Sequence, residues 1–241
     1  MNLWGRLRRL KKAVMYRFEI DPTDYRRPIK SYAQNGEDLI LRRLFGGSST
    51  GFYVDVGAHH PYRFSNFQLL YQQGWQGINI DIDARIKRRF DRIRPKDINL
   101  VFGVCQQAGD KTFYVFEEPA LSTGDLSVAQ DRVASGWRLR KEVNVPTERL
   151  DRLFEQYLPP DRQIDIMSID TEGTEYEVVL SNDWARYRPK VVVLEVSLTQ
   201  LVDGTSVALN YLERKSYQHY FQAYNSAILI ANEHRGLLEE E

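Results

Sequence analysis

Short apolar runs alternate with longer segments of helical periodicity along this chain. Residues 52–55 have strand character, a helical segment follows, and a second apolar run ends in acid at Asp81. This order predicts a β-α-β unit with a right-handed crossover. Further apolar runs at 99–105, 164–169 and 190–196 have the length of parallel strands that are buried on both faces. We therefore expect an open, mostly parallel α/β sheet.

Cap and stop residues predict where the helices begin and end. Residues 31–45 are typical of a helix that Asn35 caps and Gly46-Gly47 closes. Ser65-x-x-Gln68 fits a capping box, and Thr174-x-x-Glu177 fits another. A helix over 205–214 should precede a final hairpin with strands at 217–224 and 227–231.

Two segments between the third and fourth core strands are less regular. Residues 106–118 favour a hairpin insertion with its turn at Ala108-Gly-Asp110. Residues 119–137 are rich in Ser, Gly and Asp, which is typical of a loop.

Two carboxylates should meet at one edge of the predicted sheet. Asp55 leaves the first strand and Asp81 leaves the second, and open α/β sheets bind ligands at the carboxyl ends of their strands. Gly57 has no Cβ, which allows a ligand to approach the backbone closely. An acid at the end of the second strand can accept hydrogen bonds from both hydroxyls of a ribose, so Asp81 is the candidate ribose ligand.

The absent motifs narrow the choice of nucleoside. Gly57 is followed by Ala58-His-His-Pro61 and not by the further glycines that wrap a pyrophosphate, and no phosphate loop ending in Gly-Lys-Ser/Thr is present. We therefore predict a cofactor without phosphates, and S-adenosylmethionine fits that description.

Three motifs carry a resemblance over roughly residues 31–231. Val54-Asp-Val-Gly-Ala58, the acid-ended run at 77–81 and Ile164-Asp-Ile-Met-Ser-Ile-Asp-Thr-Glu-Gly-Thr-Glu175 resemble the FkbM-type S-adenosylmethionine-dependent methyltransferases. The resemblance implies a class I methyltransferase fold: a Rossmann-like, seven-stranded, mostly parallel sheet with helices on both faces and an antiparallel last strand. It also implies O-methylation of a sugar, glycan or secondary-metabolite hydroxyl. This chain has His59 where family members often carry Asn, and Ser168 where they often carry Lys.

The predicted cofactor site extends beyond the two carboxylates. The resemblance implies that Gln34 closes over the methionine end of the cofactor, although residues 34–38 also suit a simple helix cap at Asn35. We expect Ala58 and Ile82, which neighbour the carboxylates, to contact the cofactor. Val104 at the end of the third strand should border the adenine, and Glu172 should complete the site. In similar enzymes the region 119–137 covers the acceptor pocket.

The candidate catalytic residues are His60, Asp170 and His59. An imidazole has an ordinary pKa of about 6.5, near working pH, so either histidine suits a general base. Alternatively, His59 only packs against the cofactor and His60 only shapes the turn. Asp170 follows the fourth strand and should reach the pocket. Asp170 and Glu195 together suit a divalent cation such as Mg²⁺, but two carboxylates are too few to predict a metal site.

Charge and composition limit the partners and the compartment. Lys plus Arg and Asp plus Glu number 33 each, so no net charge draws the chain to nucleic acid, and the basic run at 85–96 is typical of a solvated helix face. The single cysteine, Cys105, excludes an internal disulfide and suits a reducing compartment. No apolar run approaches the length of a membrane span, so we expect a cytoplasmic protein.

The amino-terminal segment is set apart by its charge. Residues 1–20 combine apolar positions at helical spacing with six positive charges before the first acid, which predicts a basic amphipathic helix. Such a helix either contacts an anionic membrane surface or packs on its own domain. We predict an extension over residues 1–30 and a methyltransferase domain over 31–241. The acceptor and the oligomeric state stay open.

Two other function classes remain as alternatives. A non-catalytic module could have kept a methyltransferase-like fold and dock on a membrane or a partner. A nicotinamide-dependent oxidoreductase on a similar sheet is disfavoured by the missing glycines.

Overall fold

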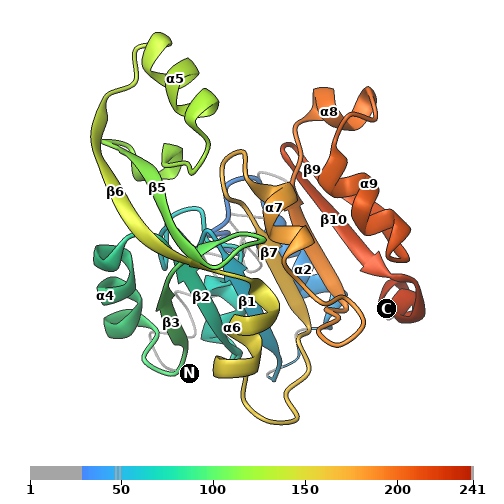
Figure 1. The fold of residues 1–241 in the computed structure, drawn as a ribbon. Coiled ribbons are helices and arrows are strands. Elements are labelled where there is room, and N and C mark those ends of the chain that lie inside the picture. The colour runs from blue at the N-terminus through green and yellow to red at the C-terminus, as the bar shows by residue number, and fades with distance from the viewer. Residues whose placement is uncertain (1–28, 47, 49, 240–241) are drawn as a thin grey trace, which may run out of the picture. The chain divides into compact units, whose positions relative to one another are not determined.

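The computed structural model describes residues 29–46, 48 and 50–239. By its internal contacts the chain divides into Met1–Ser31 and Tyr32–Glu241. The predicted basic helix of residues 1–20 lies outside the described residues. Most helices and strands of Tyr32–Glu241 are labelled in Figure 1. In the part of the chain that is described, no helix has both the length and the apolar character needed to cross a bilayer.

The elements follow one another in the α/β order that the patterning predicts. The helices are α2 (Glu37–Leu44), α3 (Gln68–Gln72), α4 (Ala84–Ile93), η1 (Pro119–Leu121), α5 (Leu126–Ala134), α6 (Leu150–Tyr157), α7 (Glu175–Leu180), α8 (Leu198–Val202), α9 (Val207–Arg214) and η2 (Asn232–Leu238). The strands are β1 (Phe52–Val56), β2 (Gln76–Asp81), β3 (Ile98–Val101), β4 (Gly103–Val104), β5 (Gly109–Phe116), β6 (Leu139–Glu148), β7 (Ile166–Ile169), β8 (Val191–Glu195), β9 (Tyr217–Ala223) and β10 (Ser226–Ala231).

A seven-stranded sheet forms the centre of this unit, in the order β3-β2-β1-β7-β8-β10-β9. The five strands from β3 to β8 pair in parallel, whereas β10 is antiparallel to both of its neighbours. The predicted final hairpin and antiparallel last strand are confirmed, and the hairpin places β10 inside the sheet and β9 at its edge. This is the class I methyltransferase sheet, so the predicted fold class is confirmed.

Side chains alternate between the two faces of this sheet, and helices cover both faces. Val54 and Val56 of β1 join a core with α6, α7 and α9, whereas Tyr53 joins a second core with α2 and α3. Asp55 lies on the Tyr53 side of β1, because successive side chains of a strand point to opposite faces. Its register partners are Asn79 on β2 and Ser168 on β7. A row of polar side chains therefore crosses the middle of an otherwise apolar face.

A second sheet, in the order β4-β6-β5, rises from the carboxyl edge of the first (Figure 1). The expected hairpin within 106–118 is wrong, because β5 pairs antiparallel with β6, which follows more than twenty residues later. The expected loop at 119–137 is also wrong, since it contains η1 and α5, and the Asp125 side chain caps α5 by accepting from Ser127 N and Val128 N. We call residues 109–148 the arm.

The predicted third strand is divided at Phe102. Residues 98–101 pair with β2 in the central sheet, whereas Gly103 and Val104 pair with β6 in the second sheet. This change of partner allows one continuous apolar run to serve two sheets and brings Val104 to the base of the arm.

Three predicted helix caps are wrong, because other groups use the capping side chains. The helix expected from residue 31 begins at Glu37 behind Gly36, and Asn35 donates to Glu37 instead of capping. Ser65 accepts from Arg94 Nη2, and α3 begins without a side-chain cap. Thr174 donates its hydroxyl to the carbonyl of Thr171, so α7 also lacks a side-chain cap.

Candidate functional site

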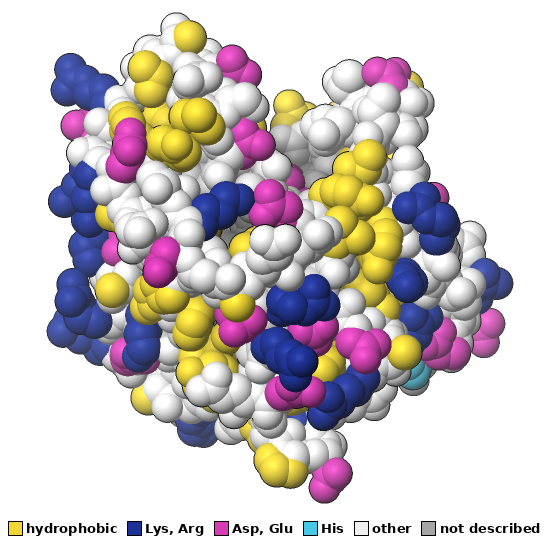
Figure 2. All heavy atoms as spheres, in the orientation of Figure 1, with side chains coloured by type: hydrophobic (Ala, Val, Ile, Leu, Met, Phe, Trp, Pro, Cys, Tyr) yellow, Lys and Arg dark blue, Asp and Glu magenta, His cyan; other side chains and the backbone are white. Residues whose placement is uncertain are grey.

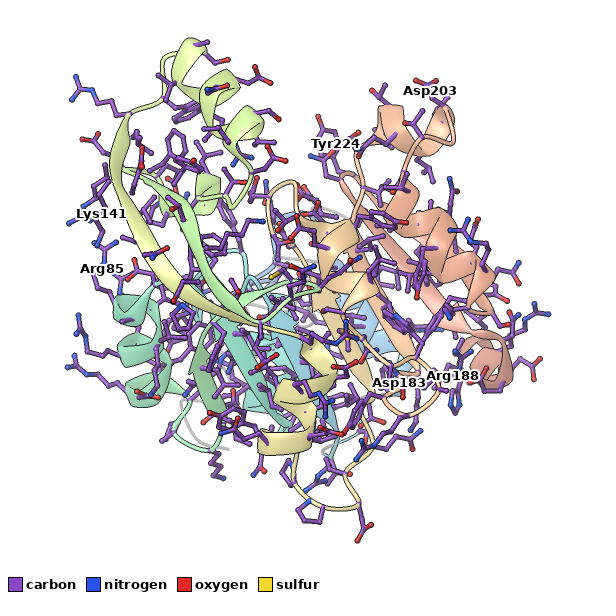
Figure 3. All side chains as sticks on the ribbon, in the orientation of Figure 1. Arg85, Lys141, Asp183, Arg188, Asp203 and Tyr224 are labelled. Atoms are coloured by element: carbon purple, nitrogen blue, oxygen red, sulfur yellow. The ribbon has the colours of Figure 1, made fainter. Side chains whose placement is uncertain are left out.

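A cavity that is partly open to solvent lies between the carboxyl ends of the central strands and the arm. Figure 2 shows a hollow between the arm and α8 on this side of the molecule. Figure 3 places Asp203 and Tyr224 on the α8 side, and Arg85 and Lys141 on the outer flank of the arm side. The cavity is lined by Gln34, Val56, Gly57, His59, Phe64, Ile80, Asp81, Ile82, Asp83, Ile86, Phe102, Gly103, Val104, Lys111, Phe113, Val115, Pro119, Ala120, Ser122, Gly124, Asp170, Thr171, Glu172 and Thr174.

Gly57 turns the chain out of β1 at the floor of the cavity. Its φ is +85°, and a Cβ added to it would lie 1.7 Å from the backbone oxygen of Asp170. The amides of Gly57 and Ala58 both donate to Ile80 O, at 3.0 and 3.1 Å. The chain itself therefore requires glycine here, because the ends of β1 and β7 approach too closely for any side chain.

Asp81 lies at the end of β2, and each of its carboxylate oxygens accepts a hydrogen bond from a backbone amide nearby. Oδ2 accepts from His59 N at 2.9 Å, and Oδ1 accepts from Asp83 N at 2.9 Å. Burial raises the pKa of this carboxyl to about 6, although these amides oppose the shift. An ionised carboxylate has about four acceptor sites, so each oxygen can still accept from a ligand in the cavity. This geometry suits two vicinal hydroxyls.

Apolar side chains form a slot beside Asp81. Ile82 follows it directly, Ile86 comes from α4, and Phe102 and Val104 come from the segment that joins the two sheets. Ile86 and Val104 are almost fully buried. A flat, weakly polar ring next to a ribose on Asp81 would lie between these side chains.

His59 reaches the cavity, whereas His60 is not among the lining residues. Both ring nitrogens of His59 are buried and have no hydrogen-bond partner among the described residues. Burial, followed by the nearby Arg63 charge, lowers the pKa of His59 to about 4, so its ring is neutral near pH 7. His60 Nδ1 accepts from the amides of Tyr62 and Arg63 at 3.0 and 3.1 Å, which fixes its ring in the turn.

Three carboxylates gather where β7 and β8 end. Asp170, Glu175 and Glu195 each bring an oxygen within 4.8 Å of the others. Burial and the neighbouring Asp170 raise the pKa of Glu195, because two adjacent carboxyls cannot both ionise without strong repulsion. Glu175 already accepts from Thr171 N and Gly173 N, at 2.9 and 3.0 Å. Asp170 is the member that lines the cavity.

Some of the other predicted cofactor residues line the cavity and some do not. Gln34 and Glu172 line the cavity with Ile82 and Val104. Asp55 is only 6% exposed and does not line it. Ala58 packs instead against a small apolar cluster with Ile86 and Phe90.

Glu172 joins the cavity floor to the arm. Its backbone is left-handed, with φ 57°, and its carboxylate pairs with Arg132 of α5. Its carbonyl accepts from Thr123 Oγ1 at 2.7 Å. Burial and the charge of Asp170 raise the pKa of Glu172 to about 7, although Arg132 opposes the shift.

The arm supplies seven residues that line the cavity. Sequence reasoning missed Lys111, Phe113 and Val115 of β5, whereas Pro119, Ala120, Ser122 and Gly124 lie in the region 119–137 that was expected to cover the acceptor pocket. The alternation over 112–116 is a signal for a strand, but it does not reveal that β5 covers the cavity. Two further ion pairs fasten the arm: Arg63 contacts both Glu118 oxygens at 3.0 Å, and Lys111 lies 3.1 Å from Glu177. The cavity thus has a roof joined to its floor by charged contacts.

Comparison with known proteins places this site in a family. The model of the methyltransferase FkbM domain matches residues 55–220, more than half of the chain. No curated protein sequence matches the chain.

Several solved methyltransferases resemble the chain at a distance. One is the O-methyltransferase TomG from Streptomyces achromogenes, involved in tomaymycin synthesis and solved with S-adenosylmethionine: identity is 12%, 89% of this chain and 84% of that chain are covered, and the TM-score is 0.42. A second is a TehB-like S-adenosylmethionine-dependent methyltransferase from Corynebacterium glutamicum. Its identity to this chain is 12%, 94% of this chain and 97% of that chain are covered, and the TM-score is 0.40. A third is the O-methyltransferase from Bacillus cereus in complex with S-adenosylhomocysteine. Its identity is 8%, 86% of this chain and 84% of that chain are covered, and the TM-score is 0.41. Similarities this distant do not bear on the acceptor, whereas the domain match covers most of the chain, which belongs to the FkbM methyltransferase family.

Proposed function

We propose that this protein is an S-adenosylmethionine-dependent O-methyltransferase that acts on a hydroxyl of a sugar, a glycan or a secondary metabolite. The observation that carries the proposal is Asp81, which keeps free acceptor capacity at the cavity beside the apolar slot of Ile82, Ile86, Phe102 and Val104. That combination suits an adenosine whose ribose has two free hydroxyls.

The residues of the cavity fit this cofactor from one end to the other. Asp81 would hold the ribose, the slot would take the adenine, and Gln34 would lie at the methionine end. When bound, the cofactor supplies an electrophilic methyl group on a sulfonium.

The protein's own contribution to methyl transfer is mainly orientation. Holding an acceptor oxygen against the reacting carbon can contribute roughly 7–11 kcal/mol to catalysis. In the neutral ring of His59 one nitrogen accepts and the other donates. The accepting nitrogen, which has no partner among the described residues, can accept a hydrogen bond from the acceptor hydroxyl and so orient it. The arm covers one side of the cavity and so limits the directions from which water can reach it.

Asp170 is the better candidate for the proton acceptor. Although the residue is exposed to the cavity, the protein around its carboxyl disfavours the charged form and raises the pKa of Asp170 to about 6, while a hydrogen bond with Glu195 opposes the shift. Asp170 is therefore a stronger base than His59, whose pKa is about 4. General bases work best when their pKa lies near working pH. The neighbouring Glu195, with its raised pKa, can keep a proton while Asp170 is ionised.

Calorimetric titration with S-adenosylhomocysteine tests the proposal. We expect saturable binding to the wild-type chain and a loss of affinity in Asp81→Asn, while Asp203→Asn on the exposed α8 end binds like the wild type. A folded wild-type chain that releases no heat would contradict the proposal. Incubation of an acceptor library with cofactor carrying a labelled methyl group, followed by mass spectrometry, would then identify the acceptor.

A further inference from the structure

A fully buried arginine lies behind the loop that carries His59. Arg94 follows α4 and has 0% of its surface exposed. Its Nη1 donates to Tyr53 OH at 3.0 Å, and that hydroxyl donates in turn to Asp97. A buried guanidinium is costly unless its donors are satisfied, so its contacts reveal what it holds.

The remaining donors of Arg94 hold the loop and the helix that follows it. Nη2 donates to Pro61 O and to Ser65 Oγ, both at 2.6 Å. Nε donates to Gln68 Oε1 at 3.1 Å, and Gln68 is the first residue of α3. One side chain thus ties β1, the loop 57–66 and α3 to the end of α4.

Asp97 anchors the same network to β2. Its Oδ1 accepts from Gly77 N at 3.0 Å, and its Oδ2 accepts from Asn79 Nδ2 at 3.0 Å. Asn79 also donates to Asn99 Oδ1 at 2.9 Å. The network therefore rests on the rigid central sheet.

The loop held in this way has a strained backbone. Gly57, His59 and Phe64 all have left-handed conformations, with φ of 85°, 50° and 58°. Residues with a side chain, such as His59 and Phe64, rarely adopt the left-handed backbone conformation and keep it only where the surrounding structure enforces it. Arg94 lies where that restraint is needed, since Pro61 and Ser65 bracket the distal half of the loop.

We propose that Arg94 is a positioning residue for the site. By fixing Pro61 and Ser65, it holds His59 so that the imidazole is buried in the cavity while His59 N stays on Asp81. Arg94 is not itself among the residues that line the cavity. Only its effect on cofactor affinity rests on the proposed function; its effect on the loop does not.

The four histidines of the chain provide the test. His59 and His60 lie on the loop, whereas His219 on β9 and His234 in η2 are remote internal controls. Nuclear magnetic resonance of the ring signals should give a depressed His59 pKa in the wild type. Arg94→Lys keeps the positive charge but loses the directed fork of donors. We expect the His59 pKa to rise by roughly one unit or more towards its ordinary value in that variant, because burial is lost.

Ser65→Ala is the milder second variant, since it removes one acceptor of Arg94 and leaves the buried charge in place. It should move the His59 and His60 signals in the same direction as Arg94→Lys, by less, with His219 and His234 unchanged. Leu212→Ala on α9 serves as a control for general destabilisation, because Leu212 is fully buried on the opposite face of the sheet. It should leave the loop histidines unchanged.

The proposal fails if both Arg94→Lys and Ser65→Ala leave the His59 pKa as in the wild type, or if Leu212→Ala shifts it equally. Binding of S-adenosylhomocysteine then tests the proposed function separately from the role of Arg94. A wild-type chain that does not bind it refutes the proposed function, while the histidine shifts still decide the role of Arg94. If the wild type binds, Arg94→Lys should bind about tenfold more weakly, since a displaced His59 no longer orients Asp81.

Discussion

Replacing Asp55 with asparagine should stabilise the folded chain above neutral pH. Asp55 is only 6% exposed in the middle of the sheet, and the described residues offer its carboxylate no side-chain or backbone hydrogen bond. Burial raises its pKa from 3.8 to about 7, although the nearby Arg94 charge opposes the shift. Asparagine has nearly the same shape and carries no charge, so the substitution isolates the cost of ionising this position.

The size of the effect can be worked from the pKa. A rise of about three units corresponds to about 4 kcal/mol of lost stability once the carboxyl is ionised in both states. This is an upper limit, since the effective dielectric inside proteins is higher than that of a dry interior. We expect about 2 kcal/mol, which for a chain of this length corresponds to a gain in Tm of roughly 4–8 °C.

The stability difference between Asp55→Asn and the wild type depends on pH. The folded pKa of Asp55 is higher than the unfolded one, so between about 4 and 7 the folded chain holds a proton that the unfolded chain has released. Stability from this group is fully present below pH 4 and is lost as pH rises towards 7. Asparagine does not titrate, so its advantage should appear over that interval and reach its full size above it.

Urea denaturation at pH 4.5 and pH 8.0 measures the difference. Asp55→Asn should be clearly more stable than the wild type at pH 8.0 and nearly equal to it at pH 4.5, while the exposed Asp203→Asn should change neither value. An equal gain at both pH values, or a loss of stability at pH 8.0, would refute the reasoning.

The same variant tests the prediction that Asp55 binds the cofactor. Because Asp55 is not among the residues lining the cavity, we expect Asp55→Asn to bind S-adenosylhomocysteine within about twofold of the wild type. A loss comparable to that of Asp81→Asn would mean that Asp55 contacts the ligand.

Three further predictions rest on single contacts. Asp81→Asn should weaken S-adenosylhomocysteine binding by about 10- to 100-fold in calorimetry, because it removes a charge-assisted acceptor, and unchanged affinity would exclude Asp81 as a ligand. Gly57→Ala should cost about 3 kcal/mol or more in urea denaturation, since its Cβ would meet the Asp170 carbonyl, whereas a stable variant would mean that the β1 and β7 ends can separate. Lowering the pH from 8 to 6 protonates Glu172, so the protection of the α5 amides, expressed relative to their intrinsic exchange rate at each pH, should decrease. Glu172→Gln should show the lower protection at both pH values, and wild-type protection that does not change with pH would argue against the Arg132 contact as the fastening.

The central sheet can be predicted because its information is local. Each core strand is a short apolar run, and each carboxylate of interest directly follows such a run, so the sequence alone places Asp81 and Asp170 at the correct edge. The glycine at position 57 also stands out in the sequence, but for a different reason. Its lack of a side chain suggests room for a ligand, whereas in the structure the backbone of Asp170 excludes any Cβ there.

The arm and the buried network could not be predicted because their partners are distant in the chain. Phe116 of β5 pairs with Leu139 of β6, and nothing in the alternation of either strand specifies the other. Arg94 lies in a run of basic residues that is otherwise typical of a solvated helix face, so its burial has no signal in composition. The predicted capping box at Ser65 is wrong for the same reason, since its hydroxyl accepts from Arg94.

The contacts that hold the two sides of the loop 57–66, which carries His59 and His60, differ in strength. The side with the weaker contacts would separate more easily. Towards the arm, Arg63 pairs with Glu118, but their side chains are 47% and 31% exposed. Exposed pairs contribute about 0–1 kcal/mol. Towards the sheet, Arg94 is fully buried, and leaving a buried hydrogen-bonding group unsatisfied costs more, about 1–3 kcal/mol for each group. Breaking the Arg63–Glu118 pair would therefore cost less than breaking the contacts of Arg94 that hold the loop of His59.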